Sequence, residues 1–334
     1  MTRKVPVLDL RKADQGPHAA AEFRRRLREA THEIGVFHLA GHGIPDQVMT
    51  ELFVTARRFF ALPPESKRAL AMVNSPHFRG YTADGGEYTQ GARDRREQID
   101  LASERPAVTH RDPRAYLRLE GPNQWPTDLP ELRPVIEDWD RRLTVLGHRL
   151  LREWAVSLGA APELFTPAFG TDPMTLIKLV RYPGRAPGES DQGVGAHKDP
   201  GVLTLLLIEP GKRGLEVELD GAWIAVEPVA GAFVVNIGEL MEWATGGYLR
   251  ATLHRVVSPP QGEERLSVPY FLNPRLDSQI PRVTLSPELA ARARGVTQDP
   301  ANVISDVFGA NMLKARLRAH PDVAARHHPD LLPG

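Results

Sequence analysis

Between residues 174 and 272 the chain is a succession of short apolar runs, rich in β-branched residues and separated by turn residues. Runs of this length and composition are typical of β-strands rather than helices. The runs are MTLIKLVRY, GVLTLLLI, GLEVEL, AWIAV, AFVVNI, LHRVVS and RLSVPYFL. Asp220-Gly221, between the third and fourth runs, is a strong signal for a hairpin turn. This block of short strands predicts a closed double-sheet barrel of the jelly-roll type.

Helical patterns flank this block on both sides. Apolar residues recur at 3.6-residue spacing at Leu132, Val135, Ile136, Trp139, Leu143, Leu146, Leu150, Trp154 and Leu158, and Gly159 follows them. We therefore expect a long helix that backs the barrel. Residues 286–319 are again helical in composition. By contrast, the glycines and polar residues of segment 74–96 predict a long, mobile loop without regular structure, of the kind that acts as a lid.

These patterns predict a mixed α and β fold that forms one integrated unit. Its expected parts are an N-terminal helical and mixed region (1–120), the backing helix (121–165), the barrel core (166–280), and C-terminal helices with a tail (281–334). The N-terminus has charges every few residues and no apolar core of signal-peptide length. No run approaches the ~18 apolar residues that span a bilayer. We therefore expect a cytoplasmic protein, a monomer or weak homo-oligomer, with no membrane partner.

Charge and cysteine content exclude several classes of function. The 42 Lys and Arg residues equal the 42 Asp and Glu residues, so the chain has no net positive field to attract nucleic acid, and we expect no such partner. The chain has no cysteine, which excludes disulfides, thiolate metal sites, Cys nucleophiles and iron–sulfur clusters. Any metal must therefore be bound by His and carboxylate side chains.

One such ligand set is visible in the pattern. His197 and Asp199 are two residues apart just before a strand-like run, so both side chains leave the same face of an extended backbone. His254 lies in a later strand-like run. Two imidazoles and one carboxylate leave coordination positions open, as in non-haem iron(II) oxygenases. A catalytic zinc on the same residues stays chemically possible, and each residue taken singly is more often structural.

A second group of residues could hold an acid. Arg265 and Ser267 project from one face of a strand-like run that follows His254, and a guanidinium beside a hydroxyl forms a carboxylate clamp. Such a clamp could take the far carboxylate of a dicarboxylic acid whose near end chelates the metal. Tyr182 could add a phenol to this carboxylate. A surface Arg with an incidental Ser, and a Tyr used only for packing, are the alternatives.

With these residues located, ordered motifs connect the chain to a known family. The motifs are GVFHLAGHGIP, FFALPPESK, KLVRYPG, GAHKDPGVLTLLL, LRATLHRVV and RLSVPYFLNP, and they cover nearly the whole length. In them the chain resembles the isopenicillin N synthase-like branch of the iron(II)/2-oxoglutarate dioxygenase superfamily. The resemblance implies a double-stranded β-helix (jelly-roll) core with flanking N-terminal and C-terminal helices. It also implies Fe(II) on His197, Asp199 and His254, and 2-oxoglutarate on Arg265 and Ser267 with help from Tyr182, with O2 as co-substrate.

Finer likenesses and departures accompany this resemblance. The loop HFRGYTADGGEYTQG and the phrase WATGGYLRATLHRV look similar to bacterial members near the ethylene-forming enzyme, although we do not infer ethylene formation. Lys198 stands in the middle of the His-x-Asp motif, where the family often has a small hydroxyl residue. Strand alternation should direct its side chain away from the iron. Val180 stands where some plant members have Asn, which leaves the inner contacts of the co-substrate open.

The resemblance implies oxidation, most simply hydroxylation, of an unactivated C–H bond of a small molecule such as an amino acid or a natural-product intermediate, with release of succinate and CO2. Two alternatives stay open: an iron-dependent oxidase of the isopenicillin N synthase type that uses no 2-oxoglutarate, and a non-catalytic barrel that binds a small acid. Candidate substrate contacts are Arg79, Tyr81 and Glu87 in the expected lid, with Arg181 and Phe271 near the barrel mouth. Ordinary surface or core roles for these five residues are equally plausible.

Overall fold

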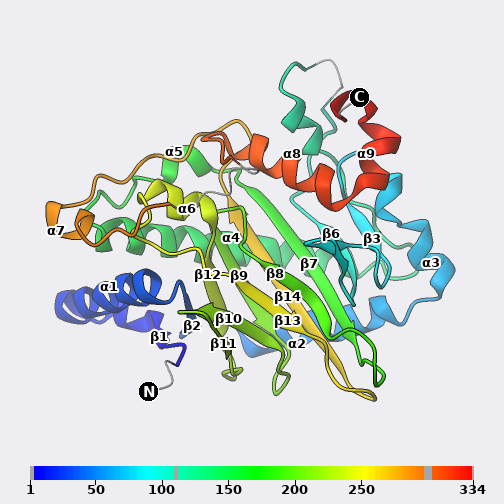
Figure 1. Cartoon of the computed structure of the whole chain (residues 1–334), viewed down its shortest axis with the longest axis horizontal. Helices are drawn as coiled ribbons and strands as arrows, with labels where there is room; N and C mark the ends of the chain where they lie inside the picture. Colours follow the sequence, from blue (N-terminus) through cyan, green and yellow to red (C-terminus); the bar gives the residue numbers. More distant parts are fainter. Residues whose placement is uncertain (1–3, 109–111, 297–302, 333–334) are drawn as a thin grey trace.

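Two β-sheets form the centre of the molecule (Figure 1). The computed structural model describes residues 4–108, 112–296 and 303–332. The strands are β1 (Val7–Asp9), β2 (Val36–Ala40), β3 (Gly80–Thr82), β4 (Tyr88–Thr89), β5 (Ala92–Arg93), β6 (Glu97–Leu101), β7 (Met174–Pro183), β8 (Gln192–His197), β9 (Leu203–Ile208), β10 (Leu215–Leu219), β11 (Ala222–Ala225), β12 (Phe233–Ile237), β13 (His254–Val257) and β14 (Glu264–Asn273). The larger sheet has the order β1-β2-β12-β9-β14-β7-β6-β3, and the smaller has the order β11-β10-β13-β8. β4 and β5 form a separate hairpin.

Helices surround these sheets. They are α1 (Gly16–Glu33), α2 (Asp46–Phe60), α3 (Pro64–Ala69), α4 (Leu132–Ser157), α5 (Thr166–Phe169), α6 (Glu239–Ala244), α7 (Pro287–Ala290), α8 (Phe308–Ala319) and α9 (Pro321–His327). Single 3-10 turns cover Leu10–Asp14, Met72–Asn74, Ala115–Leu119 and Pro329–Leu331. α4 packs against β7, β9 and β14 and is itself contacted by α1 and α2. Among the described residues, no helix has both the length and the apolar composition needed to cross a membrane.

The two sheets face each other across an apolar core. Val180 and Tyr182 of β7, in the larger sheet, are buried in one cluster with Val217 and Val256 of the smaller sheet. Alternate residues of each strand enter this layer, as the pleat requires. The double-sheet jelly roll predicted from the sequence is therefore confirmed.

The structure confirms most of the expected strands, helices and turns, but not the expected loop. Each of the seven predicted strand runs contains a strand, the long helix forms as α4, and Asp220 and Gly221 turn the chain between β10 and β11 with φ values of 53° and 84°. The expectation of segment 74–96 as a loop without regular structure is wrong, because it contains β3 and the β4–β5 hairpin. The hairpin turns at Gln90 and Gly91, with φ of 51° and 80°. A turn of this kind needs positive φ at both positions, and Gln at the first conceals it in the sequence.

Gly147 allows the backing helix to approach the barrel closely. A Cβ at this position would lie 2.4 Å from Leu272 Cδ2 in β14, and Leu272 is fully buried. Since a close-packed core resists added volume, this glycine sets the distance between α4 and the larger sheet.

We predict that Gly147→Val destabilises the fold by about 1–3 kcal/mol, because the new methyl groups force α4 and β14 apart. Chemical denaturation monitored by tryptophan fluorescence measures this change. Val145→Ala is the matched control on the same helix, since Val145 is 66% exposed and surface changes stay within about 0.5 kcal/mol. Equal stability of both variants would contradict the packing described for α4.

Candidate metal centre and co-substrate site

The three metal-ligand candidates meet where β8 pairs with β13. β8 ends at His197, β13 begins at His254, and the antiparallel register sets these two residues opposite each other. Asp199 follows β8 by two residues. Its Oδ1 lies 3.7 Å from His197 Nε2 and 3.8 Å from His254 Nε2. One ligand atom from each residue thus lies within 4.8 Å of the other two, which is close enough for a single ion.

Backbone carbonyls fix the orientation of both imidazoles. His197 Nδ1 donates to Gly195 O at 2.8 Å, and His254 Nδ1 donates to Thr252 O at 3.0 Å. Because a carbonyl only accepts, Nδ1 of each ring carries a proton, and Nε2 is the nitrogen that faces a metal. Burial, followed by the proximity of His254, lowers the pKa of His197 to about 4. At neutral pH this ring is therefore in the neutral form that binds a metal.

Asp199 is held through its second oxygen. Thr204 Oγ1 donates to Asp199 Oδ2 at 2.5 Å, and Asn236 Nδ2 donates to the same atom at 2.6 Å. Oδ1 is therefore left to face the two imidazoles. Burial by itself would raise the pKa of Asp199, but the imidazoles and these hydrogen bonds keep that pKa below its usual value. The carboxylate is both ionised and oriented.

This donor set fits ferrous iron. Two imidazole nitrogens and one carboxylate oxygen leave further coordination positions open, and such a set is typical of non-haem iron(II) oxygenases. Lys198, between two of the ligands, does not join the set. Its Nζ lies 3.2 Å from Glu242 Oε2 on α6, in line with the expectation that this side chain turns away from the iron.

The acid-binding candidates lie beside the three ligands. Arg265 of β14 is the register partner of Tyr182 of β7, and its guanidinium carbon lies 4.8 Å from the centre of the Tyr182 ring. Arg265 and Ser267 are each only 1% exposed. Within the described part of the chain, none of the three guanidinium nitrogens of Arg265 has a hydrogen-bond partner. Burial lowers the pKa of Arg265, an effect that Tyr182 partly offsets.

The unpaired guanidinium of Arg265 indicates which kind of ligand the cavity binds. Leaving a buried charge without a partner costs several kcal/mol, and a carboxylate would satisfy the guanidinium through two parallel hydrogen bonds. Arg265, Ser267 and Tyr182 line the same cavity, of about 340 Å³, as the metal-ligand candidates. That cavity therefore fits an acid that also reaches the metal, as 2-oxoglutarate does.

Two of the five candidate substrate residues reach this cavity. Glu87 and Phe271 line it, together with Thr89 of β4 and Phe308 of α8. Val180, the second departure from the family pattern, is instead buried between the sheets.

The structure does not bring Arg79, Tyr81 and Arg181 to the cavity. Arg79 donates to the carbonyls of His77 and Leu119, and the Tyr81 hydroxyl donates to Glu97. Arg181 pairs with Glu97 and Glu264. Strand alternation explains the last case, because adjacent residues of a strand face opposite ways and Tyr182 faces the cavity.

Several cavity residues were not among the candidates, and the cationic side chains of Arg96, Lys178 and Arg316 are among them. Alternation could have identified Lys178, because it lies four residues before Tyr182 on the same strand face. No comparable signal marks Arg316, since α8 is far along the sequence and reaches the cavity only through tertiary packing.

Two family descriptions match the chain. Residues 5–128 match the family described as the N-terminal region of non-haem dioxygenases in morphine synthesis, and residues 173–274 match the 2OG-Fe(II) oxygenase superfamily. The 2-oxoglutarate-dependent dioxygenase frbJ of a Dothideomycetidae species is 34% identical over 99% of this chain and 94% of its own length. A homoarginine-6-hydroxylase of Arabidopsis thaliana is 32% identical over 89% of this chain and 92% of its own.

Solved structures agree with these relatives. A crystal structure of JOX2 in complex with 2OG, Fe and JA has a TM-score of 0.69 and 28% identity, and covers 86% of this chain and 79% of its own. The structure of a rice dioxygenase for auxin oxidation has a TM-score of 0.68 and 26% identity, with 96% and 99% covered. Each of these proteins has the same overall arrangement as this chain.

We predict that His254→Ala weakens Fe(II) binding by more than the roughly 10–100-fold that the loss of an outer-shell partner costs, because a direct ligand is removed. Anaerobic calorimetric titration with Fe(II) measures the affinity. His18→Ala is the control, since His18 is exposed on α1. Unchanged affinity in His254→Ala would exclude this residue as a ligand.

Proposed function

The chain belongs to the 2OG-Fe(II) oxygenase superfamily and is an iron(II)- and 2-oxoglutarate-dependent dioxygenase, and we propose that it hydroxylates an amino acid. The observation that carries the assignment of the site is the buried, unpaired guanidinium of Arg265 beside a cluster of two histidines and one aspartate. When bound, iron and 2-oxoglutarate would together activate O2 to oxidise an unactivated C–H bond, with one oxygen atom passing to the substrate and the other to succinate, and with release of CO2.

We assign the roles of the site residues from their geometry. His197, Asp199 and His254 hold the iron on one side. Arg265 and Ser267 receive the distal carboxylate of 2-oxoglutarate, and Tyr182 packs beside the guanidinium. The metal-ligand side chains are oriented before substrate enters, because each imidazole already donates to a carbonyl two residues earlier and Asp199 accepts from Thr204 of β9.

The four predicted segments are proposed to act as one catalytic unit. The cavity is lined from the N-terminal region by Glu87, from the barrel by His197 and from the C-terminal helices by Phe308. Water is excluded only if these segments close over the cavity together. The cytoplasmic location and the monomeric or weakly oligomeric state stay predictions of the sequence.

The charged wall of the cavity supports an amino acid as substrate. Arg316 is buried, and its Nη1 donates to Asp100 Oδ2 at 2.7 Å. Its Nη2 has no hydrogen-bond partner within the described residues. Glu87 accepts from Arg96 Nη2 at 2.7 Å and lies 3.4 Å from Lys178 Nζ, and its carboxylate keeps acceptor capacity. We assign Arg316 to the substrate's carboxylate and Glu87 to a cationic group of the substrate.

The relatives support the same class. Homoarginine-6-hydroxylases of Arabidopsis thaliana and Glycine max are 32% and 33% identical to this chain. Homoarginine, the substrate in their names, is an amino acid that carries both a carboxylate and cationic groups. Homoarginine, arginine and lysine are therefore the first compounds to test, scored by product formed per succinate released.

We predict that Arg265→Gln raises the KM for 2-oxoglutarate by roughly 10–100-fold, because a charge-assisted hydrogen bond to the distal carboxylate is lost. Fe(II) affinity without co-substrate should stay unchanged. Steady-state succinate release gives the first value, and anaerobic titration gives the second. Arg213→Gln is the matched control, with its side chain 77% exposed. An unchanged KM in Arg265→Gln would remove the assigned role.

We predict that Arg316→Lys raises the KM for the amino acid roughly tenfold and increases succinate release without product, because Lys keeps the ion pair with Asp100 but lacks the second nitrogen. The KM for 2-oxoglutarate should not change. Arg326→Lys on α9 is the control. Agmatine, which is arginine without its carboxylate, should bind wild type and Arg316→Lys equally well. The assignment would be contradicted if the wild type bound agmatine more tightly than arginine.

A further inference from the structure

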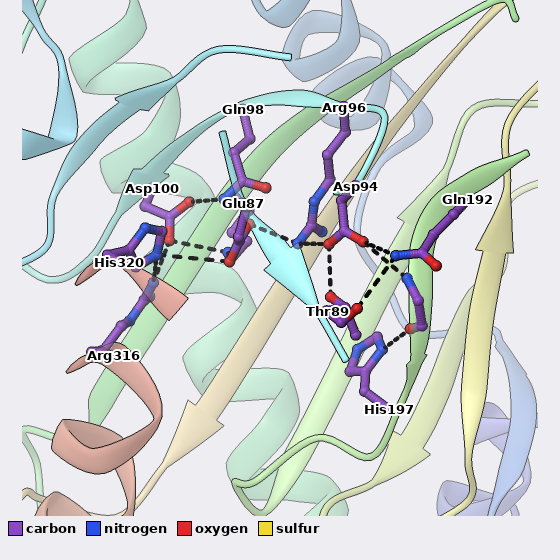
Figure 2. Close-up of polar contacts among 12 residues, drawn as sticks. Glu87, Thr89, Asp94, Arg96, Gln98, Asp100, Gln192, His197, Arg316 and His320 are labelled. Atoms are coloured by element: carbon purple, nitrogen blue, oxygen red, sulfur yellow. Dashed lines mark hydrogen bonds and ion pairs between the residues drawn. The ribbon is translucent and has the colours of Figure 1, made fainter. Parts of the chain in front are cut away.

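Asp94 is a fully buried carboxylate that the metal and co-substrate roles leave unexplained. It lies between the β4–β5 hairpin and strand β8, and its exposed fraction is 0%. Asp94 Oδ1 accepts from Gly195 N at 3.0 Å and from Gln192 Nε2 at 2.9 Å, and both donors are on β8. Asp94 Oδ2 accepts from Thr89 Oγ1 at 2.7 Å and lies 3.2 Å from Arg96 Nη2. Figure 2 shows the carboxylate between these two groups of donors.

One of these contacts continues to the metal centre. Gly195 donates its N–H to Asp94, and its carbonyl accepts the hydrogen bond from His197 Nδ1 at 2.8 Å. The same residue is therefore held on one side by Asp94 and holds the imidazole on the other. Because this carbonyl sets both the tautomer and the ring orientation of His197, a shift of Gly195 changes the direction in which Nε2 points.

On its other side, Asp94 contacts a residue of the cavity wall, Arg96. Arg96 Nη2, next to Asp94, donates to Glu87 Oε2 at 2.7 Å, and Glu87, Thr89 and Arg96 all line the cavity. We call residues 87–96 the lid segment. An unbroken series of polar contacts thus runs from the wall assigned to the substrate, through Asp94, to a metal ligand (Figure 2).

The lid segment packs closely against β8 at Gly195. A Cβ on Gly195 would lie 2.9 Å from Thr89 Cβ and 2.9 Å from Gln192 Nε2. Only glycine leaves room for the hairpin to lie against β8 at this point. The position of the hairpin and the position of Gly195 therefore depend on each other.

We propose that Asp94 is a positioning residue that ties the lid segment to β8 and thereby sets the orientation of His197. A substrate that contacts Glu87 or Thr89 also affects the contacts of Asp94. The orientation of His197 therefore depends on the position of the lid segment. This inference rests on the proposed role of His197 as a metal ligand.

The groups around Asp94 explain why a carboxylate is needed here. Gly195 and Gln192 donate hydrogen bonds to Oδ1, whereas Thr89 donates to Oδ2 and Arg96 forms an ion pair with it, and the Asp94 side chain is fully buried. An amide of the same shape has one acceptor oxygen. Its NH2 group could donate to the Thr89 hydroxyl, but it would meet the Arg96 guanidinium on the lid side or two N–H donors on the β8 side. Asp94→Asn therefore loses either the ion pair with Arg96 or the hydrogen bonds from β8.

The test measures metal binding in the absence of substrate, so that loss of a cavity contact cannot produce the result. Anaerobic titration of the full chain with Fe(II) should give roughly tenfold or greater weakening in Asp94→Asn. Hydrogen exchange of the peptide that contains Gly195 should become faster. Asp84→Asn is the matched control, because Asp84 precedes the lid segment and pairs with Arg95 rather than with β8; it should bind Fe(II) as wild type does.

Thr89→Val provides a second variant of nearly unchanged shape, and it decides the question if Asp94→Asn does not fold. It removes one donor to Asp94 and should weaken Fe(II) binding in the same direction, by a smaller factor. A lowered Tm with wild-type Fe(II) affinity in either folded variant would overturn the proposal, since it would indicate a purely structural role. Failure of the wild type itself to bind Fe(II) would instead refute the role assigned to His197.

Discussion

The pairing of β8 with β13 is the contact on which the site depends. The register places His197 opposite His254, so the metal centre exists only when the smaller sheet has formed. Residues that are far apart in sequence become neighbours through backbone hydrogen bonds, and their side chains then need only short, local hydrogen bonds to acquire the right orientation. Asp199 is the exception, because its donors Thr204 and Asn236 come from the larger sheet. The centre therefore also requires the two sheets to pack together.

Charge inside the cavity is divided in a way that fits its proposed ligands. Most buried charges are already paired: Glu87 with Arg96, and Asp100 with Lys178 and Arg316. Arg265 is left without such a partner among the described residues. The paired groups hold the wall in place, whereas the unpaired guanidinium of Arg265 requires a carboxylate partner. The same principle, applied to the free nitrogen of Arg316, supports a second and weaker carboxylate position for the substrate.

Sequence reasoning succeeded where periodicity and turn chemistry are explicit. The β-branched runs, the stripe of α4 and the Asp220-Gly221 turn each determine local structure directly. Alternation within strands predicted His197 and Asp199 as ligands, and the structure brings both together with His254. It failed at the β4–β5 hairpin, because Gln90 adopts a conformation that its type rarely favours. It also failed for Arg79, Tyr81 and Arg181, whose partners are set by tertiary packing. Asp94 has no sequence signal, since its role arises only when two separate segments lie against each other.

The most direct test of this account is a crystal structure of the chain grown without oxygen in the presence of Fe(II) and 2-oxoglutarate. The account predicts one iron bound by His197 Nε2, Asp199 Oδ1 and His254 Nε2. It also predicts that 2-oxoglutarate chelates this iron while its far carboxylate lies against the Arg265 guanidinium and the Ser267 hydroxyl. Iron bound without one of these three ligands, or a co-substrate whose far carboxylate lies away from Arg265, would contradict it.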